Sequence, residues 1–137
     1  KILTNQNTIM REILFRGKPI DEETIIGNDF YYGDLCHYAN GEVTIRQPEN
    51  GYEIAVFPET IGQFTGITDR NGKNIFEGDI LKTNEADWVG KVEFKHSAYI
   101  ISDDNGGYST YPDFSKCEVI GNIFDTHELL NNQPNVR

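Results

Sequence analysis

The stretch GQFTGITDRNGKNIFEGDIL, residues 62–81, decides the fold of this 137-residue chain. Its first residues continue a strand that is predicted over residues 60–65. The segment DRNGK, residues 69–73, predicts a turn, because Asn and Gly tolerate the left-handed backbone that many tight turns need. The residues that follow predict a strand that enters a small barrel. We therefore expect the boundary between two subdomains near residues 66–72.

Short strand-like segments continue on both sides of this stretch. Each is rich in Val, Ile, Tyr or Phe and is bounded by Gly, Pro, Asn or Asp, a pattern typical of antiparallel strands. Together they predict an all-β sandwich or barrel, with helix only over residues 126–130. The further strands are predicted over residues 13–17, 30–38, 42–46, 52–57, 80–82, 88–94, 99–101 and 118–124.

The clearest hairpin signal is Asn40-Gly41, between the predicted strands 30–38 and 42–46. A two-residue turn of this kind has positive φ at both central positions, which Asn and Gly tolerate. Val43 and Ile45 are predicted to share one face of the returning strand. Gly33, inside the first strand, predicts a β-bulge.

The charge of the chain limits its partners. It has 22 acidic and 12 basic residues, a net charge of −10. Proteins that bind duplex DNA gain affinity by neutralising phosphates with Lys and Arg, so duplex DNA is not an expected partner. The acidic surface keeps the protein soluble or faces a basic partner. No apolar run approaches the roughly 18 residues that a membrane-spanning helix needs, so no membrane partner is expected.

No motif indicates catalysis, a metal or a cofactor. Cys36 and Cys117 lie far apart in the sequence and are read as reduced cytoplasmic thiols. The three histidines show no ligand spacing, and no phosphate-binding loop or nucleophile motif is present. Glu77 and Asp79 would share a face if they lay on one strand. We interpret that pair as part of a turn rather than as an acid–base pair, and expect no enzymatic activity.

Five motifs together resemble the YopX family of phage and prophage proteins. The resemblance covers about residues 10–130 and implies two unlike β subdomains, the C-terminal one an SH3-like barrel. It also implies an oligomer in the cytoplasm of a bacterial host, and it supplies no catalytic residues. Residues 21–29 depart from the family pattern. The motifs are MREILFRGK (10–18), YGDL (32–35), IGQFTG (61–66), DRNGKNIFEGDI (69–80) and VIGNI (119–123).

The resulting division of the chain has four parts. Residues 1–9, before Met10, are predicted to be a disordered leader or one added for expression. Residues 10–66 form the N-terminal β subdomain and residues 67–127 the SH3-like barrel. Residues 128–137 form a short helical turn and a frayed tail.

Aromatic residues of the C-terminal half are the candidate binding site. In an SH3-like module, exposed aromatic side chains form a groove for an extended peptide or stack single-stranded bases. The alternative is that they cover the open end of the barrel. Trp88 is expected to be the most exposed. The candidates are Trp88, Tyr99, Tyr108, Tyr111 and Phe114.

Two functions remain open at this point. The first is a non-catalytic interaction module that binds a host or phage protein. The second is an accessory protein that binds single-stranded nucleic acid through the SH3-like subdomain. The acidic composition favours the first, unless four lysines share one face: Lys82, Lys91, Lys95 and Lys116.

We also predict a homo-oligomer held by the N-terminal half. Residues 10–66 contain few large aliphatic side chains and make a small core on their own. A strand over residues 10–16 at the edge of a sheet would also need a partner. Light scattering at micromolar concentration is expected to give a mass above that of one 15.6 kDa chain, and the monomer mass would contradict the prediction.

Overall fold

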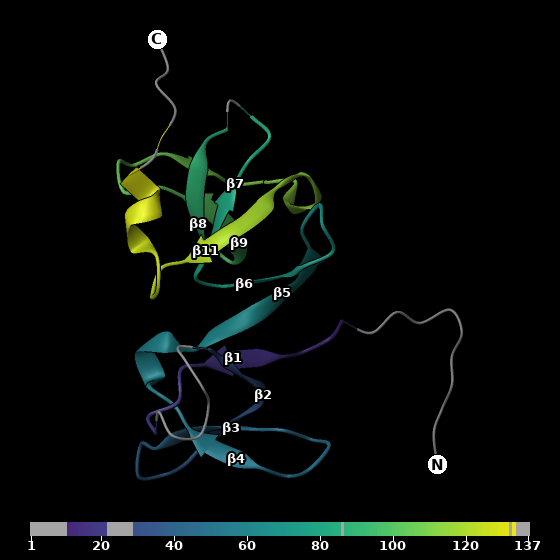
Figure 1. Ribbon diagram of the computed structural model, residues 1–137, viewed down its shortest axis with the longest axis vertical. Helices are drawn as coiled ribbons and strands as arrows, with labels where there is room; N and C mark the ends of the chain where they lie inside the picture. The colour runs from purple at the N-terminus through teal and green to yellow at the C-terminus, as the bar shows by residue number, and fades with distance from the viewer. Residues whose placement is uncertain (1–10, 22–28, 86, 132, 134–137) are drawn as a thin grey trace, which may run out of the picture.

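The computed structural model describes residues 11–21, 29–85, 87–131 and 133, and confirms an all-β protein built from two antiparallel sheets (Figure 1). Strands β1 to β4 lie in one half of the elongated molecule and the C-terminal sheet in the other, and β5 runs from the first half to β6 in the second. The predicted leader and most of the predicted tail lie outside the described residues. The strands are β1 (Phe15–Gly17), β2 (Tyr31–His37), β3 (Val43–Arg46), β4 (Glu53–Ala55), β5 (Gly62–Thr68), β6 (Asn74–Phe76), β7 (Asp79–Lys82), β8 (Val89–Lys95), β9 (Ala98–Ser102), β10 (Tyr108–Ser109) and β11 (Glu118–Asn122).

Helical structure in the described residues is limited to short 3₁₀ turns. The predicted turn near residue 126 is present as η3 (His127–Asn131). Two further turns were not predicted, η1 (Pro58–Thr60) and η2 (Phe114–Lys116). In η1 the proline sits in the first turn, where its missing N–H costs nothing. In η2 the side chain of Asp113 accepts a hydrogen bond from the Ser115 N–H and caps the turn.

The N-terminal sheet has the order β4-β3-β2-β1-β5-β6. Residues that follow β1 turn back to the outer edge of β4: the Ile20 N–H donates to the Ala55 carbonyl, and the Phe57 N–H donates to the Lys18 carbonyl. The C-terminal end of the β4 edge, at Ala55, is thereby covered. The expectation of an edge strand near residue 16 is wrong, because β1 lies between β2 and β5. The argument for an oligomer loses that support, and the oligomer itself stays a prediction.

The bulge expected at Gly33 is also wrong. Strand β2 keeps a regular register with both neighbours, pairing Gly33 with Phe15 and Asp34 with Arg46. Gly33 is needed for another reason: a Cβ atom there would overlap the carbonyl oxygen of Arg46. The strand changes partner at this point, and only glycine allows the backbones to approach so closely.

The hairpin at Asn40-Gly41 is present but is longer than two residues. The Tyr38 N–H donates to the Glu42 carbonyl, and the Gly41 N–H donates to the Tyr38 carbonyl. Gly41 has a φ of 91°, whereas Asn40 does not have positive φ. This is the pattern of a turn followed by one left-handed residue, so only Gly41 needs the left-handed conformation.

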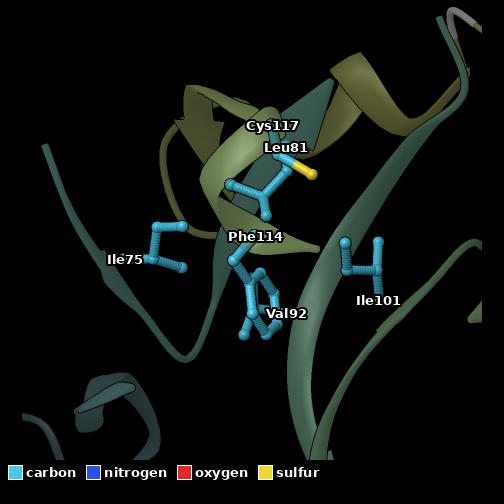
Figure 2. Close-up of a cluster of buried hydrophobic side chains, with 6 residues drawn as sticks. All are labelled: Ile75, Leu81, Val92, Ile101, Phe114 and Cys117. Atoms are coloured by element: carbon cyan, nitrogen blue, oxygen red, sulfur yellow. The ribbon is translucent and has the colours of Figure 1, made fainter. Parts of the chain in front are cut away.

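The C-terminal sheet has the order β10-β9-β8-β7-β11 and encloses the larger core, part of which Figure 2 shows. Ile75 reaches this core from β6, a strand that belongs to the N-terminal sheet by its hydrogen bonds. The classification of this half as SH3-like stays a prediction. The core shown comprises Ile75, Leu81, Val92, Ile101, Phe114 and Cys117.

The two halves meet at a buried ion pair. Arg16 of β1 places Nη2 2.8 Å from Oδ1 of Asp79 at the start of β7, and the two side chains are only 5% and 3% exposed. The guanidinium lies between two aromatic rings, 3.9 Å from the centroid of Phe30 and 4.8 Å from that of Phe76. Burial raises the pKa of Asp79 above its usual value, and the charge of Arg16 opposes that rise.

A second link joins the halves beside this pair. Lys18 Nζ lies 3.0 Å from Oδ2 of Asp125. The predicted boundary after residue 66 falls inside β5 (Gly62–Thr68), so it does not coincide with a loop. The two halves are thus joined by the chain, through the β5–β6 hairpin, and by side-chain contacts.

Replacing Gly41 with Val is expected to lower the free energy of unfolding by about 1 kcal/mol or more. No heavy atom lies within 4 Å of the position that a Cβ atom would take, so the cost comes from the backbone conformation rather than from a clash. Gly41→Asn is the control, since Asn tolerates the left-handed region. Chemical denaturation measures both, and a Val variant as stable as the parent protein would contradict the assignment of this turn.

Candidate binding groove at the β10 edge

Strand β10 forms one edge of the C-terminal sheet. Its two residues pair with β9, Tyr108 opposite Ser102 and Ser109 opposite Ile101, and this is the only pairing that the described residues give it. Successive side chains on a strand point to opposite faces. Tyr108 and Ser109 accordingly line two different hollows, one on each side of the sheet.

The outer groove has a volume of about 530 Å³ and lies along β8, β9 and β10. Its charges are mixed: Lys91 Nζ lies 3.5 Å from Oδ1 of Asp104, and Glu93 accepts a hydrogen bond from the hydroxyl of Ser102. Tyr108 is 65% exposed at its end. The groove therefore offers polar contacts and one aromatic ring, without an excess of positive charge.

The inner pocket is smaller, about 170 Å³. Its floor contains the buried side chains of Ile101 and Cys117, and the indole of Trp88 and the ring of Tyr111 also line it. Tyr111 is 94% exposed. The carboxylates come from Glu85 and Asp113, and the remaining lining residues are Thr83, Asn84, Ser109, Pro112 and Lys116.

Asp103 holds the groove in shape. Its Oδ2 accepts a hydrogen bond of 2.8 Å from the Trp88 indole N–H, and its Oδ1 accepts the N–H groups of Asn105 and Gly107. Burial by itself would raise the pKa of Asp103, but these hydrogen bonds outweigh it and lower the pKa. One carboxylate thus fixes both the indole and the 103–107 loop that leads into β10.

The five predicted aromatic residues do not form one site. Trp88, Tyr108 and Tyr111 gather around β10, as described above. Phe114 is 5% exposed and belongs to the core (Figure 2). Tyr99 is half-buried, packs edge-on against Phe94 and accepts a 3.5 Å hydrogen bond from Arg11. Trp88 is half-buried against the core, so the expectation that it is the most exposed of the five is wrong, and Tyr111 takes that place.

The other predicted features have structural positions. Glu77 and Asp79 do not share a strand, because Gly78 between them has a φ of 90° and forms the turn from β6 to β7. Glu77 accepts the Gln63 N–H, and Asp79 accepts the Phe76 N–H. Among the described residues, no group of three or more His, Cys, Asp or Glu side chains could hold a metal ion.

Cys36 and Cys117 are both free thiols. Burial, followed by the charge of Asp113, raises the pKa of Cys117 to about 11. A thiol with this pKa is protonated at neutral pH, and the thiolate is the nucleophilic form. Cys117 therefore has a packing role. No helix in the described parts of the chain has the length and hydropathy to cross a membrane.

Sequence reasoning missed the acidic residues of the groove. The run from Asp103 to Gly107 has the Asp, Asn and Gly composition of a loop, and nothing in it points to Trp88. Its hydrogen bond to Trp88 links positions 15 residues apart, and no local pattern reveals such a contact. Glu85 and Asp113 lie far apart in the sequence, and only the fold brings them to one pocket.

Comparison with known proteins finds a family model and solved structures that are similar to the chain. The model of the YopX protein family matches residues 14–131. The crystal structure of the protein YopX from Bacillus subtilis has a similar fold, with a TM-score of 0.53 and 18% sequence identity over 88% of this chain and 98% of that chain. At this identity the likeness concerns the fold alone. No curated protein matches the chain.

Replacing Asp103 with Asn is expected to free the Trp88 indole. The single carbonyl oxygen of the amide can accept from the loop N–H groups, but the amide nitrogen that replaces Oδ2 cannot accept from the indole N–H. Trp88 is the single tryptophan of the chain, so its fluorescence reports this change directly as a shift to longer wavelength. The loss of stability should be about 1–2 kcal/mol.

The lowered pKa of Asp103 sets the pH dependence of this difference. A carboxyl with a depressed folded-state pKa contributes stability above its unfolded pKa and loses it as the pH falls through the folded value. The free energy of unfolding of the parent protein should therefore exceed that of Asp103→Asn at pH 7, and the two values should converge in acid. Asp104→Asn is the matched control, expected within about 0.5 kcal/mol of the parent. An unchanged emission maximum in Asp103→Asn would contradict the role of this carboxylate.

Proposed function

The chain belongs to the YopX family, and we propose that it is a non-catalytic interaction module that binds an extended segment of a protein partner along the edge of β10. The observation that carries this proposal is the pairing of an open strand edge with a hollow on each of its faces. A host or phage protein is the expected source of the segment.

An open edge recognises a peptide through the backbone. A partner segment that adds a strand beside β10 would use main-chain hydrogen bonds for affinity, and its alternate side chains would point to opposite faces. The outer groove and the inner pocket lie where those side chains would go. Tyr108 and Tyr111 are both largely exposed beside β10, so their rings can pack against the side chains of the bound segment.

The acidic character of the chain supports a basic segment as the partner. The net charge is −10, and the hollows around β10 are lined by Glu85, Glu93, Asp103, Asp104 and Asp113. Complementary charge would steer the encounter and raise its rate.

The arrangement of the lysines gives less support to single-stranded nucleic acid. Lys91 and Lys95 line the outer groove, Lys116 lines the inner pocket, and Lys82 lines neither. Lys91 is also paired with Asp104. A nucleic-acid groove needs a continuous run of positive charge with stacking aromatics, and these four residues do not provide one.

The experiment is a selection of peptides from a random seven-residue display library on the purified protein. The enriched peptides are then synthesised with a fluorescent label and titrated by anisotropy. Tyr108→Ala and Tyr111→Ala are expected to weaken binding about tenfold or more each, as truncation of a central aromatic anchor does. Tyr52→Ala is the control, because Tyr52 is also well exposed but lies in the N-terminal half.

Two results would contradict the proposal. One is that no peptide is enriched, or that enriched peptides bind the two tyrosine variants and Tyr52→Ala equally well. The other is that a labelled oligothymidylate binds more tightly than any peptide, with an affinity that falls steeply as salt is added, which is the behaviour of a nucleic-acid-binding protein.

A further inference from the structure

The geometry points to one specific role for the inner pocket: we propose that it accepts a single cationic side chain, lysine or arginine, of the bound segment. This inference rests on the proposed function, because it names the partner chemistry of the same site. It starts from the walls of the pocket rather than from the strand edge.

The size of the pocket fits one side chain. Its volume of about 170 Å³ lies below the roughly 300–1,000 Å³ of sites that enclose a small-molecule ligand. The floor is apolar, made by Ile101 and Cys117, and suits the methylene stem of a long side chain. The walls and rim then decide which end group is favoured.

The polar and aromatic groups of the walls favour a positive end group. Trp88 and Tyr111 present two aromatic rings, and the face of an aromatic ring attracts a cation. Glu85 and Asp113 add two carboxylates. No hydrogen bond or ion pair to the carboxylate of Glu85 occurs among the described residues, so this group is open to an incoming cation.

The carboxylates that line the pocket also act on the buried thiol at its floor. After burial, the charge of Asp113 contributes most to the raised pKa of Cys117, Arg70 opposes the rise, and Glu85 and Asp69 add to it. Both carboxylates are therefore near enough to act on the same point. The negative potential that disfavours a thiolate there stabilises a cation in the same place.

Lys116 is the internal competitor for this position. It lines the pocket, and its Nζ lies 3.8 Å from Oδ2 of Asp113. The lysine side chain is 63% exposed, so it holds Asp113 loosely and can move aside. Two carboxylates and one lysine line the pocket, so its side chains carry a net charge of one negative unit.

The test uses small probes that do not depend on the strand edge. N-acetyl-lysine methylamide is titrated into the full chain, and Trp88 emission and amide chemical shifts are followed. N-acetyl-norleucine methylamide has a similar stem without the charge and is the matched control ligand. The lysine probe is expected to give a saturable change centred on Trp88, Glu85 and Asp113, and the norleucine probe none at the same concentration.

Two variants check the assignment of the charges. Glu85→Gln should weaken binding of the lysine probe about threefold or more, and Lys116→Gln should strengthen it by a similar factor, as expected for partly exposed ion pairs. Glu59→Gln, an exposed carboxylate in η1, is the control and should leave binding unchanged.

The inference is overturned if neither probe binds, if the norleucine probe binds as well as the lysine probe, or if Glu85→Gln and Lys116→Gln leave the affinity unchanged. These failures are distinct from failure of the proposed function. Selected peptides whose binding depends on Tyr108 and Tyr111, but is unchanged when their lysine is replaced by glutamine, would support the β10 edge site and contradict the cation pocket.

Discussion

The Arg16–Asp79 ion pair is the interaction on which the arrangement of the two halves depends. Each charge would be costly to bury alone, and each comes from a different half of the chain. The rings of Phe30 and Phe76 exclude water from the guanidinium, and the Asp79 carboxylate also fixes the turn between β6 and β7. Moving one half away from the other would leave a desolvated charge without its partner.

This junction and the β10 groove lie in different parts of the fold but share one core. Strand β7 carries Asp79 at its start and Leu81 in the C-terminal core, where Leu81 packs with Ile101 of β9. Ile101 pairs in register with Ser109 and forms the floor of the inner pocket. The inner pocket thus rests on residues of the C-terminal core, while its exposed ring, Tyr111, lies beside the sheet edge.

The sequence allowed prediction of most strands, because turn residues delimit them locally. It failed where distant segments meet. Gly33 looked like a bulge, although its role is to let β2 approach Arg46. Phe114 looked like a groove residue because it lies in a polar loop, although that loop folds it into the core. The bonds from Asp103 to Trp88 and from Arg16 to Asp79 span many residues, so no periodicity or motif could reveal them.

The most direct test of this account is a double-mutant cycle on Arg16 and Asp79, followed by chemical denaturation. Arg16→Met keeps much of the apolar stem, and Asp79→Asn keeps an acceptor for the Phe76 N–H. Each single variant should lose about 3–5 kcal/mol, because it leaves one buried charge unpaired. The double variant should lose clearly less than the sum, with a coupling energy of about 2 kcal/mol or more and one cooperative transition. Additive losses, within about 0.5 kcal/mol, would show that the pair does not hold the halves together.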